Sequence, residues 1–205
     1  MNRSRVSSLR QAFLQRFGFT APAEFVALAG EVEGLSLPVL PEFHWLTAEE
    51  VAGFAFLEHQ WPDFVPFARS TRGDLWCWCP ESGAGGKVPV GVCPLDCEEG
   101  EIYAPDFSCA LFRLICDSAR HLSEVPSGIS AAATLLRDSA ALTVPVWPEE
   151  WRAWLTRMAE NPVSQWREHG SPCFGIIPRS EYDRVVRDWI DDGDVGSVFR
   201  WMTAP

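Results

Sequence analysis

Two pairs of cysteines have spacings that can bind a transition metal. One pair is Cys77-X-Cys79 and the other is Cys93-X-X-X-Cys97. Cysteine thiolates in closely spaced pairs are common ligands of zinc. If all four thiolates met at one point, the chain would hold a tetrahedral metal centre, and a metal-dependent enzyme would be a candidate function.

The predicted strand pairing argues against this metal centre. A glycine-rich turn is expected to pair the strand Leu75–Cys79 with the strand Val88–Val92. In this register Cys93 lies opposite Asp74, which places it roughly 10 Å from Cys77 because a strand rises about 3.3 Å per residue. Thiolates that share one zinc lie much closer together. We therefore expect buried structural cysteines and no bound metal.

A cysteine and a histidine also lie near each other, at His169 and Cys173. A nucleophilic cysteine needs contact with a base and a third group that orients this base, and the spacing indicates neither. The chain has no Gly-X-Ser-X-Gly motif, no phosphate-binding loop and no dinucleotide fingerprint. We expect no catalytic residues and no cofactor, with a Cys-dependent enzyme as the alternative.

Two acidic runs are the stronger candidates for a functional site. Carboxylates on a loop can bind Arg or Lys side chains of a partner without being buried in the protein's own core. The second run follows a predicted helix, where the helix dipole makes negative charge unfavourable, so stability alone does not explain it. An exposed tryptophan would add an aromatic anchor. The predicted partner-binding residues are Trp61, Asp96, Glu98, Glu99, Glu101, Asp191, Asp192 and Asp194.

The charge of the chain limits the class of partner. The net charge is −11, from 28 acidic and 17 basic residues among 205. Nucleic acids and anionic membrane surfaces are bound by clustered Lys and Arg, so both are disfavoured, and a basic protein is the expected partner. No stretch approaches the roughly 18 apolar residues of a membrane span, and no secretory signal is evident. Seven cysteines without a disulfide framework indicate reduced thiols, hence a cytoplasmic location.

The elements that position these residues are organised around a predicted hairpin between Trp61 and Pro80. Its turn is Ser70–Gly73, where the glycine suits a positive φ and Asp74 can accept hydrogen bonds from the turn backbone. The strand Leu75–Cys79 is apolar on both faces, so we expect it to be central in a sheet. Thr47 and Glu50 predict a capping box at the start of a helix that stops before Trp61.

The hairpin resembles the core hairpin of the SUKH superfamily, which includes bacterial toxin-immunity proteins and the fungal cell-wall assembly regulator. The resemblance rests on Pro66-Phe67-Ala68, a short polar turn, and Gly73-Asp74 before an aromatic-rich strand. Three further segments are similar in order and spacing: Phe17–Phe25, Val88–Val92 and Ala104–Phe107. The chain departs from the family where Ser70-Thr71-Arg72 replaces a run of glycines.

These observations predict an α+β fold with a central antiparallel sheet, flanking helices and a helical C-terminal lobe. We expect a SUKH-like domain over residues 1–122 and a Trp-rich helical extension over residues 123–205, packed on it. The resemblance implies a non-enzymatic immunity protein that neutralises a toxin domain. A regulatory scaffold like the fungal family member, or an enzyme that uses a cysteine or a metal, remain the alternatives.

Overall fold

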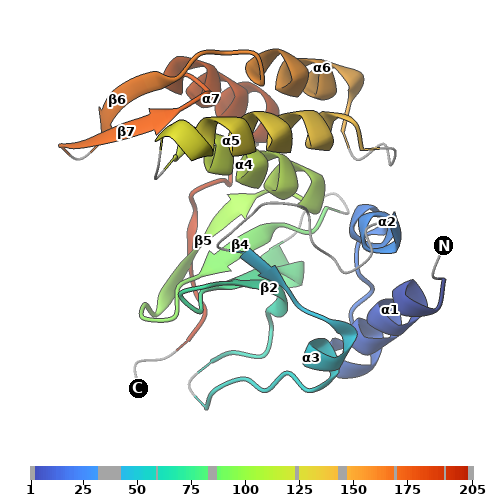
Figure 1. Ribbon diagram of the computed structural model, residues 1–205. Helices are drawn as coiled ribbons and strands as arrows, with labels where there is room; N and C mark the ends of the chain where they lie inside the picture. The colour runs from blue at the N-terminus through green and yellow to red at the C-terminus, as the bar shows by residue number, and fades with distance from the viewer. Residues whose placement is uncertain are drawn as a thin grey trace. The chain divides into compact units, whose positions relative to one another are not determined.

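The computed structural model describes residues 3–31, 43–58, 60–82, 87–122, 125–142, 147–168, 170–191 and 193–202. Figure 1 shows the elements, which in chain order are α1 (Arg3–Phe17), α2 (Ala23–Glu31), β1 (Phe43–Trp45), α3 (Ala48–Ala52), β2 (Val65–Ser70), β3 (Leu75–Trp78), η1 (Pro80–Ser82), β4 (Val90–Cys93), β5 (Glu99–Ala104), α4 (Phe107–Arg120), α5 (Val125–Ala140), α6 (Glu149–Met158), β6 (Ser164–Glu168), β7 (Ser171–Gly175), α7 (Arg179–Val185), η2 (Val186–Ile190) and β8 (Val198–Arg200).

The fold is α+β, as the sequence predicts. Six strands form one antiparallel sheet in the order β1-β2-β3-β4-β5-β8, with helices beside it. The C-terminal part contains the predicted helices but also strands. Strands β6 and β7 form a separate hairpin, and β8 joins the main sheet beside β5.

The chain divides into two compact units. Their boundaries differ from the expected boundary, which lies after Leu122. The first unit is Met1–Ala110 together with Asp191–Pro205, and the second unit is Leu111–Ile190. The reason is the pairing of β8 with β5, which returns the end of the chain to the first unit. In the described part of the chain, no helix is long and apolar enough to cross a membrane.

The hairpin of β2 and β3 forms as predicted, although its polar side chains have other roles than expected. Gly73 has φ 95°, the left-handed conformation that the turn requires. The hydroxyl of Ser70, rather than the carboxylate of Asp74, accepts the N–H groups of Arg72 and Asp74. Asp74 instead accepts hydrogen bonds from the Ser70 hydroxyl at 2.9 Å and from the N–H of Leu95 at 3.2 Å. It therefore ties the turn to the loop that follows β4.

The register of β3 and β4 differs by one residue from the predicted register. Cys93 pairs with Leu75 and not with Asp74. The N–H of Cys79 donates to the carbonyl of Pro89, so the connection between the two strands is one residue longer than expected. A shift of one residue moves a side chain to the other face of the sheet. Cys93 and Cys77 therefore lie together in one buried cluster, and the predicted separation of roughly 10 Å between them is wrong.

Bringing these two thiols together does not assemble a metal site in the described residues. No group of three Cys, His, Asp or Glu side chains in that part of the chain is arranged to hold a metal ion. Burial, and then the neighbouring Cys93, raise the pKa of the Cys77 thiol. Both effects favour the neutral thiol over the thiolate that binds metals.

The main core of the first unit surrounds Trp78. This side chain is fully buried, and its ring centroid lies 5.2 Å from that of Phe13, 5.0 Å from Phe25 and 4.6 Å from Phe67. The contacts with Phe13 and Phe25 are edge-to-face, an arrangement that stabilises an aromatic core beyond the burial of area. The core holds helices α1 and α2 on the face of the sheet that carries Trp78, and it fixes the position of β3 (Figure 1).

Helix α3 begins with the predicted capping box but is shorter than predicted. The hydroxyl of Thr47 accepts the N–H of Glu50, and the Glu50 carboxylate accepts the N–H of Thr47 at 2.8 Å. The helix ends at Ala52, and Gly53 caps it, so the following residues are not helical. Glu50 also contacts His44 and Arg69. Partial burial opposes its ionisation, but hydrogen bonds from Thr47, His44 and Arg69 outweigh this and lower the pKa of Glu50 to about 2.

Replacing Glu50 with glutamine is expected to lower the free energy of unfolding by about 1 kcal/mol at neutral pH, because glutamine keeps the cap but loses the charge. The pKa of Glu50 is lower in the folded protein than in the unfolded chain, so the charge stabilises the fold above its usual pKa near 4.5. This contribution is lost as the pH falls toward about 2. Urea unfolding followed by circular dichroism, at neutral and acid pH, measures the difference.

Glu49→Gln is the matched control for this experiment, because Glu49 lies in the same helical turn and is exposed. We expect its effect on the free energy of unfolding to be smaller. A difference between wild type and Glu50→Gln that stays constant down to about pH 2 would contradict the role of the Glu50 charge.

In the second unit, strand β7 lies directly against the end of helix α4. The N–H of Ile176 donates to the carbonyl of Ala119 at 3.2 Å, and the N–H of Leu122 donates to the carbonyl of Phe174 at 2.9 Å. Gly175 lies between these bonds. A Cβ at this position would collide with the backbone of Arg120, whose Cα would be 2.7 Å away. The strand can approach the helix only because residue 175 has no side chain.

Candidate functional site

Strand β8 is held on the sheet by the ring of Phe199 and two glycines beneath it. A Cβ added at Gly91 would lie 2.7 Å from this ring, and one added at Gly100 would lie 2.8 Å from it. Real Cβ atoms do not approach this closely, so glycine at both positions makes room for the ring. The ring of Phe64 stacks on Phe199 with a centroid distance of 4.9 Å. This packing fixes the last strand of the sheet.

Trp201 connects three segments at the end of β8. It is 1% exposed, and its indole N–H donates to the carbonyl of Cys97 at 2.8 Å. Its backbone N–H donates to the carbonyl of Glu98 at 3.0 Å, and its carbonyl accepts the N–H of Trp61 at 2.9 Å. The acidic loop before β5, strand β8 and the segment at Trp61 are therefore held next to one another.

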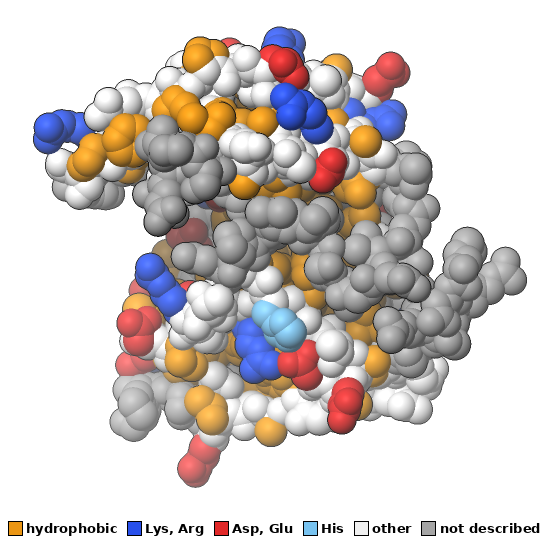
Figure 2. All heavy atoms as spheres, viewed as in Figure 1, with side chains coloured by type: hydrophobic (Ala, Val, Ile, Leu, Met, Phe, Trp, Pro, Cys, Tyr) orange, Lys and Arg blue, Asp and Glu red, His pale blue; other side chains and the backbone are white. Residues whose placement is uncertain are grey.

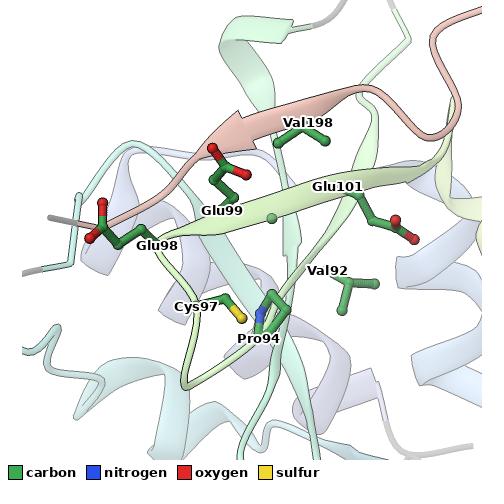
Figure 3. Close-up of a pocket in the computed structure, with 8 residues that line it drawn as sticks. Val92, Pro94, Cys97, Glu98, Glu99, Glu101 and Val198 are labelled. Carbon is green, nitrogen blue, oxygen red and sulfur yellow. The ribbon is translucent and has the colours of Figure 1, made fainter. Parts of the chain in front are cut away.

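A hollow with a volume of 590 Å³ lies beside β5 and β8, and Figure 3 shows its lining. The strand registers place Val92, Glu101 and Val198 in one row across three strands, so their side chains share a face. Val198 is 64% exposed. The lining combines apolar and acidic side chains with one thiol, and comprises Val92, Pro94, Cys97, Glu98, Glu99, Gly100, Glu101 and Val198.

The structure places the first predicted acidic run at this hollow. Glu98, Glu99 and Glu101 line it, and Asp96 lies exposed on the loop between β4 and β5. Arg200 forms an ion pair with Glu98 at 3.4 Å. Within the described part of the chain, Glu99 and Glu101 form no ion pair, so their charges face solvent.

The second predicted run lies at the other end of β8. Asp191 and Asp194 are exposed, and the carbonyl of Asp194 accepts the N–H of Ser197 in the turn that leads into the strand. The N–H of Gly196 donates to the carbonyl of Ile102 in β5. The two acidic runs therefore flank one pair of strands. Asp192 lies outside the described residues.

Trp61 is also beside this pair of strands and is 38% exposed. Its backbone bond to Trp201 fixes its position at the end of β8 where the acidic loop lies. The structure thus gathers predicted residues from three separate parts of the sequence. On the face seen in Figure 2, acidic, basic and hydrophobic side chains are mixed.

The chemistry of the thiols favours protonated sulfur. Cys97 is exposed at the hollow, where local desolvation and the nearby carboxylate of Asp96 raise the pKa of its thiol. Burial raises the pKa of the Cys79 and Cys116 thiols as well. A raised pKa lowers the fraction of thiolate, which is the nucleophilic form. His169, the predicted neighbour of Cys173, lies outside the described residues.

Sequence reasoning missed the apolar half of the hollow and the strand that borders it. Val92 meets Glu101 through the pairing of β4 with β5, and Val198 joins them only because β8 pairs with β5. In β8 the exposed Val198 and Arg200 alternate with the more buried Phe199, but Val198 is apolar, so the sequence shows the alternation typical of a sheet edge only at Arg200. Three residues are too few for this signal to be read with the partner strand unknown.

Comparison with known proteins adds no relative. No protein-family model, no curated protein and no solved structure matches this chain.

Proposed function

We propose that this protein is a non-enzymatic binding protein, and that it acts as an immunity protein which neutralises a basic toxin domain in the cytoplasm. The observation that carries the proposal is the hollow of 590 Å³ beside β5 and β8, lined by Glu98, Glu99 and Glu101 together with apolar side chains. Carboxylates around an apolar surface suit a partner with Arg or Lys side chains around an apolar contact.

The resemblance to the SUKH superfamily supports the same function, because the family includes toxin-immunity proteins. Toxins that attack nucleic acid have positively charged clefts, and an acidic surface can occupy such a cleft. The raised pKa values of Cys77, Cys79 and Cys97 support binding over nucleophilic catalysis, because they favour the neutral thiol.

The affinity should depend on charge and on an apolar contact together. Opposite charges accelerate encounter, and salt weakens this effect because the Debye length is about 8 Å at physiological ionic strength. Trp61 and Val198 offer exposed apolar area next to the carboxylates. Desolvated aromatic side chains contribute a large share of binding energy in protein interfaces.

The test measures binding of the toxin domain encoded next to the gene of this protein, at low and at high salt. Glu98→Lys combined with Glu99→Lys is expected to weaken binding at least about tenfold, because like charges would then face each other. The matched control is Glu149→Lys with Glu150→Lys, an adjacent exposed pair in α6 that changes the net charge equally.

Binding that is insensitive to salt and to charge reversal at Glu98 and Glu99 would remove the electrostatic mechanism. Equal weakening by the control pair in α6 would show that net charge acts without a defined site. If the toxin domain does not bind the wild-type protein, the immunity function is wrong.

A further inference from the structure

We propose that the partner adds an extended basic segment to the sheet as a strand next to β8. This inference rests on the proposed function and names how the partner is bound. Strand β8 is the last strand in the order of the sheet, and among the described residues no strand pairs with the outer side of Val198–Arg200. A sheet edge presents unpaired backbone groups that can pair with another chain.

The register of β5 and β8 identifies the backbone groups at this edge. The N–H of Ile102 donates to the carbonyl of Ser197, and the N–H of Trp201 donates to the carbonyl of Glu98. Along β8, the backbone groups of Ser197 and Trp201 therefore face β5. The backbone groups of the residues at alternate positions face away from β5. The pairs Val198 with Glu101 and Arg200 with Glu99 are therefore non-hydrogen-bonded pairs. The N–H and C=O groups of Val198 and Arg200 consequently point outward, away from β5.

The accessible edge has defined ends. At one end, the outward groups stop at Arg200, because Trp201 directs its N–H to the carbonyl of Glu98 and its carbonyl accepts the N–H of Trp61. At the other end, the turn at Asp194 and Gly196 leads the chain into the strand. An added strand would thus pair only with the short segment Val198–Arg200.

The acidic side chains beside β8 favour a partner segment that carries Lys or Arg. Side chains on one face of the added strand would project over Val198 toward the hollow, where Glu99 and Glu101 lie (Figure 3). Val198 is small, so the long stem of a Lys or Arg can pass across it to Glu101. A second copy of this chain would bring the same carboxylates against these, and like charges repel. The occupant is therefore a basic partner and not another copy.

The first experiment uses a proline at the edge. Val198→Pro removes the outward N–H and adds a ring at the edge, but it removes no bond to β5. We expect the toxin domain to bind this variant at least about tenfold more weakly than wild type. Val198→Thr keeps the N–H and the β-branched shape, so its affinity should stay within about threefold. Circular dichroism confirms that both variants are folded.

The second experiment does not depend on the toxin. A short peptide of alternating Lys and Val, blocked at both ends, is added to the full chain, and amide hydrogen exchange is measured at Val198 and Arg200. We expect slower exchange at both amides. An alternating Glu and Val peptide, and a Lys and Val peptide methylated on its backbone nitrogens, are the matched controls, and neither should slow the exchange.

The two experiments separate this inference from the proposed function. Equal toxin binding by wild type and Val198→Pro overturns strand addition and leaves the immunity function in place. If the toxin domain does not bind, the immunity function is overturned. If only the Lys and Val peptide then slows the exchange, this result still supports strand addition at β8. Unchanged exchange at both amides, or equal effects of all three peptides, overturns strand addition by a basic segment, as does dimerisation through β8.

Discussion

Replacing Gly175 with alanine is expected to destabilise the second unit by about 3 kcal/mol or more, because overpacking against fixed backbone exceeds the usual cost of an added methyl group. The new Cβ would meet the backbone of Arg120 at the end of α4, with its Cα 2.7 Å away. Backbone atoms cannot rotate aside as a flexible side chain can. To fit the methyl group, β7 must move away from α4 and stretch the bonds at Ala119 and Leu122.

Chemical denaturation of the full chain, followed by far-ultraviolet circular dichroism, measures this change. Gly170→Ala is the matched control in the same hairpin, since Gly170 has φ 84° and no atom within 4 Å of an added Cβ. It should cost only about 1 kcal/mol, the strain of a left-handed alanine. Equal effects of the two variants would contradict the role of Gly175 in the close approach of β7 to α4.

Replacing Trp201 with alanine is expected to cost about 3–5 kcal/mol in the stability of the first unit, the usual range for a large buried aromatic side chain. The side chain is 1% exposed and packs in a cluster with Cys77, Cys93 and Met202. Its loss also removes the bond that holds the carbonyl of Cys97. Strand β8 and the acidic loop should therefore separate, and the binding of a basic partner that we propose should weaken together with stability.

Trp201→Phe separates packing from hydrogen bonding. It keeps an aromatic ring but lacks the indole N–H, and the loss of one such bond costs about 1 kcal/mol. We expect exchange of the β5 amides to rise strongly in Trp201→Ala and only slightly in Trp201→Phe. A Trp201→Ala variant with wild-type stability and unchanged exchange in β5 would contradict the role of Trp201 as the connection between these segments.

The fold class could be predicted from the sequence wherever local chemistry decides the structure. The capping box of Thr47 and Glu50 and the glycine at position 73 are local signals, and both have the predicted geometry. The apolar faces of the segment Leu75–Cys79 predict a central strand, and β3 is central in the sheet. The sequence pattern predicts too long a helix α3, because Phe54 continues a helical pattern of apolar residues although Gly53 ends the helix.

Pairing between distant segments could not be predicted in this way. The register of β3 and β4 depends on one residue in their connection, and the predicted register placed Cys93 on the wrong face. Strand β8 lies far along the chain from β5, and its three residues carry no local pattern strong enough to identify the partner. For the candidate site, the sequence indicated the acidic residues, whereas the hollow between Val92, Glu101 and Val198 depends on this pairing.

The pairing of β5 with β8 can form only late in synthesis, because β8 lies near the end of the chain. The ribosome completes β5 roughly ninety residues before β8, a delay of roughly 5–20 seconds at typical translation rates. During this interval β5 has an open edge, and such edges can template aggregation between nascent chains. Glu99 and Glu101 lie on this edge and would repel the same segment of a neighbouring chain. The carboxylates proposed to attract a basic partner to the finished protein would thus first protect the unfinished one.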